Sequence, residues 1–326
     1  MRIVACGKPF FCIYIPPGNY RKFDILGFGN TEGGVLKVEP ECYICLLERA
    51  LRIAQLASSD REKVVEVLKG VSELLIREFT RESVPAIIGT KRERVISEIL
   101  GIEDPYRKLK EESNRVAAEI VQEIFARIDI DDISYANFRR VMILAAAANA
   151  MEWFIRGHKF SLEIFDSELK AAMENLAIDD SQTLYGLVKG RNILYLLDNA
   201  GEAVVDLWVV RYLKKLAKRV VVGAKSKPVL NDITVDEARR IGFEEIADAL
   251  IPTGEYVGVV LEYATEELRR ELSIADVIIA KGMGSFETLT EYRLGKPTFV
   301  ILKAKCAPVA RILGVEQGKL VIKRIA

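Results

Sequence analysis

A run of five apolar residues without alternation, residues 193–197, most narrowly limits what this chain can fold into. An apolar run of that length is typical of a strand buried on both faces, as in a parallel sheet covered by helices. Asp198 and Asn199 follow it directly, and Gly201 comes soon after. Open α/β sheets bind ligands at the carboxyl ends of their strands. An aspartate there is also a common helix cap, but the adjacent amide and the glycine favour a ligand site.

The chain from residue 192 onwards alternates short apolar runs with helical patterns. The predicted strands are residues 193–197, 220–222, 249–251, 277–280, 298–302 and 320–322, and the predicted helices are residues 203–217, 235–241, 261–272 and 286–294. This alternation predicts an α/β fold, a three-layer α/β/α domain with a largely parallel sheet. Residues 40–187 show helical spacing almost throughout, so we expect an all-helical N-terminal domain before the sheet.

Three segments are therefore expected along the chain. Residues 1–36 form an irregular extension rich in glycine and proline, residues 37–190 a helical domain, and residues 191–326 an α/β/α domain that binds metal and phosphate. The extension has a second interpretation. Residues 32–35 can be encoded by a purine-rich, ribosome-binding-like run and Leu36 by a TTG start codon. Under this hypothesis residues 1–35 are a mistranslated leader.

The composition argues against several functional classes. The chain has 47 Lys and Arg and 47 Asp and Glu, which gives no overall preference for nucleic acid or an anionic membrane. No apolar run approaches the ~20 residues of a membrane helix, and the first residues lack the apolar region of a signal peptide. We expect a cytoplasmic protein with its five cysteines reduced. The single histidine, His158, excludes zinc sites built on several histidines and argues against a Ser-His-Asp hydrolase.

Polar and ionic residues follow five successive predicted strands. These residues are Asp198 and Asn199, then Asn231 and Asp232, then Thr253 and Gly254, then residues 281–287, and finally Lys303, Lys305 and Cys306. Two acids and an amide are hard oxygen ligands for a divalent cation. Lysines and a Gly-x-Gly turn at a helix start can hold a phosphate. Each feature alone also fits a helix cap, a turn or a solvated edge, but together they indicate metal-assisted phosphoryl chemistry.

These segments also resemble a known family. Residues 198–202, 230–234, 281–287 and 303–306 resemble, in order, the motifs of the damage-control phosphatase family, also called domain-of-unknown-function 89. Residues 40–45, with Cys42 and Cys45, resemble the opening of its prokaryotic Cys-x-x-Cys branch. The resemblance covers roughly residues 37–326. It implies a helical part on a three-layer α/β/α domain, and metal-dependent removal of phosphate from small phosphorylated metabolites.

The resemblance also implies roles for individual residues. Asp198, Asn199 and Asp232 would hold the metal, and Asp198, Asp232 and Lys305 would be catalytic. Substrate and phosphate binding would fall to Lys305, the backbone at Lys281, Gly282, Gly284 and Ser285, and to Asn149, Glu152, Thr253, Gly254 and Glu287. Asn149 and Glu152 correspond to a family Asn-x-x-Asp pattern, here with an acid one methylene longer, and Ser285 stands where the family usually has Asn. The expected cofactor is Mg²⁺, Mn²⁺, Co²⁺ or Ni²⁺, with no organic cofactor.

Several questions stay open from the sequence. Asn149 lies in a segment that is apolar all round, and it is either a satisfied core amide or a site residue. The nucleophile is either metal-bound water or a carboxylate such as Asp198. Cys42 and Cys45 are either two buried small side chains or, with Cys306, part of a second metal site.

The predicted function is a metal-dependent phosphatase that acts on phosphate monoesters of small metabolites, such as sugar phosphates. The partner is then a small phosphorylated metabolite rather than nucleic acid or membrane, and no oligomeric state is predicted. A methyltransferase using S-adenosylmethionine is one alternative, because doubly wound sheets host that cofactor too. A non-catalytic metabolite- or nucleotide-binding module is another, and it predicts binding without turnover and without metal dependence.

Overall fold

The computed structural model of the chain describes residues 35–150, 170, 174 and 176–326. Glu152, His158 and all but the last residue of the proposed leader lie outside this description. None of the helices in the described ranges is both long and apolar enough to cross a membrane.

Seven strands in the described part of the chain form one sheet in the order β1-β7-β6-β5-β2-β3-β4. The strands are β1 (Leu176–Asp179), β2 (Asn192–Leu196), β3 (Arg219–Ala224), β4 (Ala249–Pro252), β5 (Val277–Lys281), β6 (Thr298–Lys303) and β7 (Leu320–Arg324). All neighbours run parallel except β6 and β7, which pair antiparallel. The predicted largely parallel sheet is therefore confirmed.

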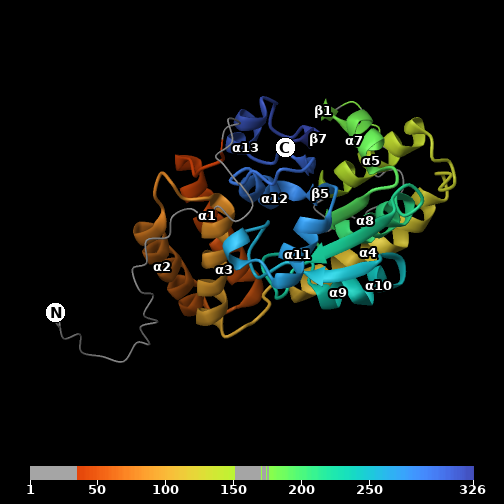
Figure 1. Cartoon of the computed structure of the whole chain (residues 1–326). Coiled ribbons are helices and arrows are strands. Elements are labelled where there is room, and N and C mark those ends of the chain that lie inside the picture. The colour runs from red at the N-terminus through yellow and green to blue at the C-terminus, as the bar shows by residue number, and fades with distance from the viewer. Residues whose placement is uncertain (1–34, 151–169, 171–173, 175) are drawn as a thin grey trace.

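Helices cover both faces of this sheet (Figure 1). One face carries α4 (Arg107–Phe125), α5 (Tyr135–Ala150), α7 (Ser181–Val188), α8 (Glu202–Leu213), α9 (Val235–Arg240) and α10 (Phe243–Ile246). The other carries α11 (Glu266–Ile274), α12 (Gly282–Leu289) and α13 (Ala307–Leu313), with the short helix η1 (Leu261–Tyr263) preceding α11. In β2, Ile193 and Tyr195 belong to the first core while Leu194 and Leu196 belong to the second. A strand without a polar face was expected from the unbroken apolar run.

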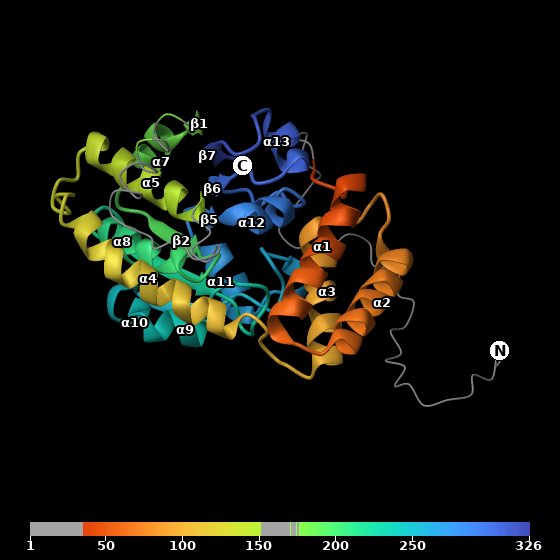
Figure 2. The ribbon, with the colours of Figure 1, turned by 180° about the vertical axis from the view of Figure 1, so that it is seen from behind.

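The first three helices form a separate bundle beside the sheet (Figure 2). They are α1 (Pro40–Ala57), α2 (Arg61–Glu78) and α3 (Pro85–Leu100). The Asp60 side chain caps α2 by accepting from the backbone N–H groups of Glu62 and Lys63. Gly101 ends α3 in the left-handed region, with φ of 66°. These helices share a core of their own, which includes Leu46, Ile53, Val71 and Ile96.

The structure differs from the sequence prediction in three places. Residues 176–179, predicted as helical, form the edge strand β1, whose four residues alternate between exposed and half-buried positions and so lack an apolar run. The helices α4, α5 and α7 fall inside the range assigned to a helical domain, yet they pack on the sheet. The helix predicted at residues 286–294 is α12, which begins earlier, at Gly282.

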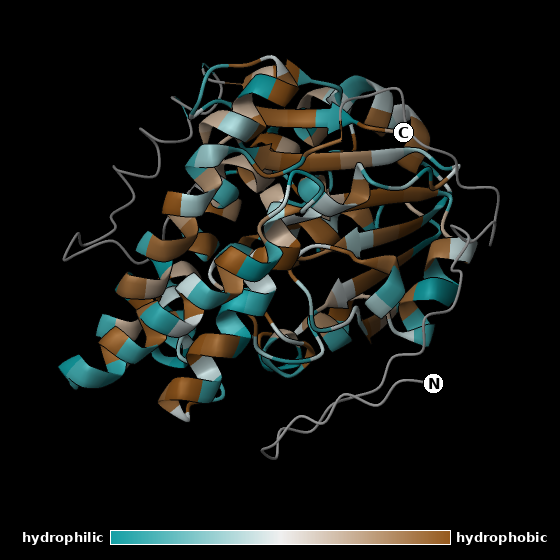
Figure 3. Ribbon diagram, turned by 90° about the vertical axis from the view of Figure 1, so that its left-hand side faces the viewer, coloured by the Kyte–Doolittle hydropathy of each residue, from teal (hydrophilic) through white to brown (hydrophobic). Residues whose placement is uncertain are grey.

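The α1–α3 bundle lies at the end of the sheet where the strands terminate (Figures 1 and 3). The loop after β3 and the loop after β4 contact it, since Val229 and Val257 pack against Val84 and Ala86. Any site at the carboxyl ends of the strands is therefore bordered by the sheet on one side and by the bundle on the other.

Candidate active site

The loops that follow β2 and β3 bring Asp198 and Asp232 together. Asn199 and Asp232 form an isolated antiparallel bridge. The Ile233 N–H donates to the Asp198 carbonyl at 2.9 Å, and the Ala200 N–H donates to the Asn231 carbonyl at 2.9 Å. Asp198 is 9% exposed and Asp232 2%. Two acids some thirty positions apart in the sequence thus share one buried site.

Both carboxyl groups have unusual acidities. Burial raises the pKa of Asp198 well above its ordinary value, and the nearby charges of Asp232 and Glu202 raise it further. Burial also raises the pKa of Asp232 to about 6, although Lys225 and Lys110 act to lower it. Acids that repel each other in a low-dielectric site favour binding of a cation that neutralises them.

Two amides link Asp198 to a third acid, Glu202. The Asn149 side-chain N–H group donates to Asp198 Oδ2 at 3.1 Å and to Glu202 Oε2 at 2.9 Å. The Asn199 amide donates to the same two atoms at 2.7 and 3.2 Å. Asn149 also accepts a hydrogen bond from the Lys303 N–H at 2.9 Å. Asn149 is therefore a site residue with its hydrogen bonds satisfied. The side-chain nitrogen of Asn199 faces the acids, which leaves the side-chain oxygen of Asn199 available to a ligand.

The Lys281 side chain contacts this cluster through Glu202 and is fully buried. Its ammonium donates to Asp206 Oδ1 at 2.8 Å and to the Ala145 carbonyl at 3.0 Å, and it pairs with Glu202 Oε1 at 2.5 Å. Desolvation acts to lower the pKa of Lys281, but Asp206 and Glu202 outweigh it and raise that pKa. With three partners for three N–H groups, the side chain has no donor left for a phosphate. The predicted phosphate contact is through the backbone at Lys281, and it stays a prediction that the position of this side chain does not affect.

Gly282 allows the start of α12 to approach Asp198. Its φ is +79°, and a Cβ atom there would stand 1.9 Å from Asp198 Oδ2. At Gly284 a Cβ would meet Val257 Cγ1 at 2.5 Å. The first turn of a helix has backbone N–H groups without intrahelical partners, and its dipole favours anions. The structure therefore places this first turn against the carboxylate cluster, where a phosphate was expected.

Lys305 and Lys225 are the lysines on the two sides of the acid pair. The positive charges of Lys305 and Lys225 both act to lower the pKa of Asp198. Lys225 is buried, donates to the Gly258 carbonyl at 2.5 Å and lies 3.8 Å from Asp232 Oδ2. Lys305 is half-buried, and its ammonium has no hydrogen bond or ion pair within the ranges described. Lys305 is thus the lysine that can receive a phosphate beside Asp198.

Thr253 and Gly254 support the site from outside it. The Thr253 hydroxyl donates to the Ala224 carbonyl at 3.1 Å. The Gly254 N–H donates to the Ser226 hydroxyl at 3.0 Å, and its carbonyl accepts from the Ser226 N–H at 2.9 Å. These contacts fix the loop after β3 and give no indication of direct substrate binding.

Ser285 and Glu287 lie in α12 and are buried. Burial raises the pKa of Glu287 to about 7, against the opposing charge of Arg49 on α1. Glu287 therefore faces the helical bundle.

The cysteines of the predicted Cys-x-x-Cys motif lie on α1. Cys42 and Cys306 are half-buried, while Cys45 is exposed. The expectation of two buried small side chains is therefore wrong for Cys45. Among the residues described, no three His, Cys, Asp or Glu side chains form a group that could hold a metal ion. The candidate centre at Asp198 instead combines two carboxylates with an amide.

These residues fit a divalent cation. The Asp232 Oδ2 atom is buried and has no hydrogen-bond partner in the described part of the chain, which is costly unless a ligand satisfies it. Oxygen donors from Asp198, Asp232 and Asn199 are the ligand types that Mg²⁺ and Mn²⁺ prefer. Asp198, Asn199 and Asp232 would therefore hold the metal.

Three residues of the site were absent from the predicted set: Glu202, Asp206 and Lys225. Glu202 and Asp206 lie four residues apart in α8 and are buried at 1% and 0% exposure. The sequence did contain a signal for them, because two acids at this spacing share one face of an otherwise apolar helix. Such a pair requires buried positive partners.

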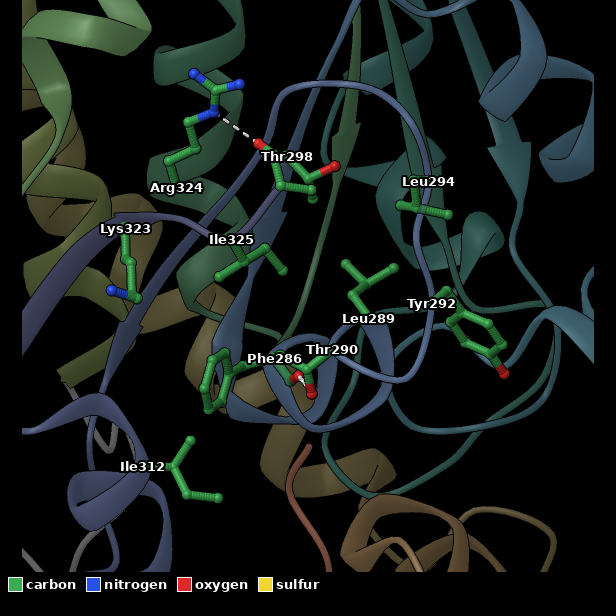
Figure 4. Close-up of a pocket in the computed structure, with 11 residues that line it drawn as sticks. Phe286, Leu289, Thr290, Tyr292, Leu294, Thr298, Ile312, Lys323, Arg324 and Ile325 are labelled. Atoms are coloured by element: carbon green, nitrogen blue, oxygen red, sulfur yellow. Dashed lines mark hydrogen bonds between the residues drawn. The ribbon is translucent and has the colours of Figure 1, made fainter. Parts of the chain in front are cut away.

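A separate cavity of about 160 Å³ lies near the C-terminus (Figure 4). Phe286 and Leu289 of α12, Thr298 and the last residues of the chain line it. It shares no residue with the carboxylate cluster, so it does not bear on the chemistry of Asp198 and Asp232.

Comparison with known proteins assigns the family. The profile of the "Damage-control phosphatase ARMT1-like domain" matches residues 38–321. The chain belongs to the damage-control phosphatase family. A damage-control phosphatase of Archaeoglobus fulgidus is 32% identical over 290 residues, which is 88% of this chain and 99% of the relative. A damage-control phosphatase of Pyrococcus horikoshii is 32% identical over 292 residues, 89% of this chain and 98% of the relative.

Other relatives agree with this family assignment. An uncharacterised protein of Methanocaldococcus jannaschii is 33% identical over 296 residues, 89% of this chain and 96% of that protein. The crystal structure of a domain-of-unknown-function 89 protein from Pyrococcus horikoshii superposes with a TM-score of 0.82 at 33% identity. The match covers 89% of this chain and all of that structure. Membership of the family and the fold class expected from the sequence are therefore confirmed, while the Cys-x-x-Cys branch stays a prediction.

Proposed function

We propose that this chain is a divalent-metal-dependent phosphatase that hydrolyses phosphate monoesters of small metabolites, with sugar phosphates as the leading class. The observation that carries the proposal is the placement of Asp198 beside Asp232 in a buried site near Lys305, whose ammonium has no partner among the residues that the structure describes. Membership of the family supports the same reaction. Cys42 and Cys45 favour the Cys-x-x-Cys branch of that family.

A divalent cation held by Asp198, Asn199 and Asp232 would polarise a phosphoryl oxygen and neutralise charge on the phosphoryl group. The residues of the chain supply the rest of the environment. Lys305 and the N–H groups at the start of α12 offer positive charge and hydrogen bonds to the remaining phosphoryl oxygens. Asn149 and Asn199 hold Asp198 Oδ2 in place, and Glu202 accepts from the same two amides. Such fixed groups stabilise a transition state without reorganising during the reaction.

The reaction forms one bond to phosphorus and breaks the bond to the leaving alcohol oxygen, which takes up a proton. Asp198 Oδ2 accepts both amide hydrogen bonds, so Oδ1 is the oxygen that could attack phosphorus if a carboxylate is the nucleophile. Water is the other nucleophile. Rapid acid quenching with ³²P-labelled substrate separates the two, because only carboxylate attack leaves labelled protein.

The decisive experiment is a phosphate-release screen over phosphorylated metabolites with Mg²⁺, Mn²⁺, Co²⁺ or Ni²⁺ and a chelator control. We expect turnover that needs the metal and that disappears in Asp198→Ala. Asp236→Ala is the matched control, because Asp236 is an aspartate of α9 whose side chain is 75% exposed. Wild-type turnover in purified Asp198→Ala with metal present would show that the site assignment is wrong.

The same screen addresses the two alternatives. A non-catalytic binding module would bind a ligand without releasing phosphate and without a metal requirement. A methyltransferase would bind S-adenosylmethionine, which isothermal titration can measure directly.

A further inference from the structure

Arg49 is a cation without a partner at the edge of the candidate site. It lies on α1, its side chain is exposed, and it makes no hydrogen bond or ion pair with any residue that the structure describes. Arg52, one turn further along the same helix, pairs with Glu48 at 2.9 Å. The contrast is informative, because an exposed arginine near acids usually forms such a pair.

The position of α1 directs Arg49 towards the carboxyl ends of the strands. At the start of α1, Glu41 pairs with Arg311 of α13 at 3.2 Å. The loop that carries Asp232 meets the α1–α3 bundle, since Leu230 packs against the core that α1 shares with α2 and α3. Helix α12 contacts the same bundle through α3. The bundle that carries α1 therefore lies against the loop after β3 and the helices that follow β5 and β6.

Arg49 shares the side of α1 that faces the sheet. Cys45 and Cys42 lie one and two turns before it, at spacings that place residues on one helix face. The negative charge of Glu287, on α12, acts on both Cys42 and Arg49. The charge of Arg49 in turn acts to lower the pKa of Glu287 and of Asp232, both of which burial raises. Tyr106 and Glu93 of the helical region act on Arg49 as well, so the guanidinium lies between the bundle and acids from two different strand ends.

We propose that Arg49 binds the phosphoryl group of the substrate from the helical bundle, opposite Lys305. This inference rests on the proposed phosphatase function and adds a substrate contact to it. The two cations act on different members of the acid pair, because Lys305 is close to Asp198 whereas Arg49 is close to Asp232. A phosphate over the acid pair would lie between them. The planar guanidinium can donate two parallel hydrogen bonds to a phosphate, which a lysine cannot do.

The test measures the affinity for inorganic phosphate by isothermal titration at pH 8 with saturating Mn²⁺, together with kcat and KM for p-nitrophenyl phosphate. The variants are Arg49→Ala, Arg49→Lys and the matched control Arg52→Ala. A hydrogen-bonded charge contact predicts phosphate binding roughly 10- to 100-fold weaker in Arg49→Ala. Arg49→Lys should recover part of this loss, and Arg52→Ala should bind like the wild type.

Each outcome distinguishes the inference from the proposed function. If the wild type releases phosphate and Arg49→Ala binds phosphate equally well, Arg49 does not contact the substrate and the phosphatase assignment stands. A lowered melting temperature without a change in phosphate affinity would likewise assign Arg49 a structural role and overturn the inference. If the wild type binds phosphate without turnover, the proposed reaction fails, while the Arg49 variants still report on the contact. A wild type that does not bind phosphate overturns both.

Discussion

Replacing Gly282 by alanine tests how closely the first turn of α12 fixes Asp198. The φ of Gly282 is +79°, and an alanine in that region costs about 1–2 kcal/mol of stability. The new Cβ would also stand 1.9 Å from Asp198 Oδ2, 2.2 Å from Cγ and 2.6 Å from Oδ1. The substitution therefore combines a backbone penalty with a direct clash at the site.

The clash gives the size of the expected effect. Carbon atoms in such contacts stay at least 3.0 Å away, so the nearest oxygen must retreat from 1.9 Å to 3.0 Å, by about 1.1 Å. Asn149 and Asn199 both hold that oxygen, which makes the movement costly for the whole cluster. A misplacement of about 1 Å at a reacting centre lowers rates about 100-fold, which is about 2.7 kcal/mol in activation free energy. We expect a loss of kcat/KM of at least this size.

Gly314→Ala is the matched control for this experiment. Gly314 ends α13 with φ of +69°, and a Cβ there would meet nothing within 4 Å. Both variants should lose about 1–2 kcal/mol of unfolding free energy to the backbone, and urea denaturation should show a larger total loss for Gly282→Ala because of its clash. Metal-dependent phosphate release should fall in Gly282→Ala and stay at the wild-type level in Gly314→Ala. The reasoning is refuted if the two variants release phosphate at the same rate.

Three further predictions concern the acids of the site. Mn²⁺ at 100 times its dissociation constant should raise the unfolding free energy of the wild type by about 2.7 kcal/mol. The same Mn²⁺ concentration should leave the unfolding midpoint of Asp232→Asn unchanged. An equal shift of the midpoint in the two proteins would contradict the assignment of Asp232 as a ligand. The pKa of Asp232 is raised to about 6 and that of Asp198 is raised as well, so protons compete with the cation for these ligands. Mn²⁺ affinity measured by titration should therefore fall as pH is lowered through 6, and a flat profile from pH 8 to pH 5 would argue against the assignment. Glu287 has its pKa raised from 4.5 to about 7 in the folded protein, so the native state holds the proton more tightly. Glu287 alone should therefore cost metal-free protein about 3 kcal/mol of stability as pH rises from its ordinary pKa through 7, on top of a loss of the same sign from Asp198 and Asp232. Glu287→Gln should make the fall in stability between pH 5 and pH 8 smaller in urea unfolding, and an unchanged slope would assign it to other groups.

The central sheet could be predicted because its inner strands carry the pattern of a strand buried on both sides. In β2 the alternate residues Ile193 and Leu194 enter opposite cores, so no polar face interrupts the apolar run. β1 has no such signal, because an edge strand of four residues buries little and alternates with exposed positions. The placement of α4 and α5 on the sheet could not be predicted either. A helical pattern shows which side of a helix is apolar but not which element that side contacts.

The acid pair could be predicted for a similar reason. Asp198 and Asp232 follow neighbouring parallel strands, and the ends of such strands meet at one edge whatever the loops do. The direction of Lys281 could not be predicted, although it also follows a strand. The ammonium of Lys281 pairs with Asp206 and Glu202 of α8. This contact depends on how α8 packs on the sheet, which the local sequence does not show. The position of Arg49 relative to the site likewise depends on how a separate helical bundle docks against the loops.

The buried charges explain why these lysines and acids occur together. Asp198, Glu202, Asp206 and Asp232 carry four negative charges when ionised, and Lys225 and Lys281 carry two positive ones, all with side chains at most 9% exposed. An excess of two negative charges in a low-dielectric region is strongly unfavourable unless protons or a divalent cation neutralise it. The raised pKa values of Asp198 and Asp232 show where protons are taken up without the cation. Lys281 pairs with both Asp206 and Glu202 Oε1, which leaves Glu202 Oε2 to the two amides. The uncompensated negative charge therefore remains near Asp198 and Asp232, where the cation is proposed to bind.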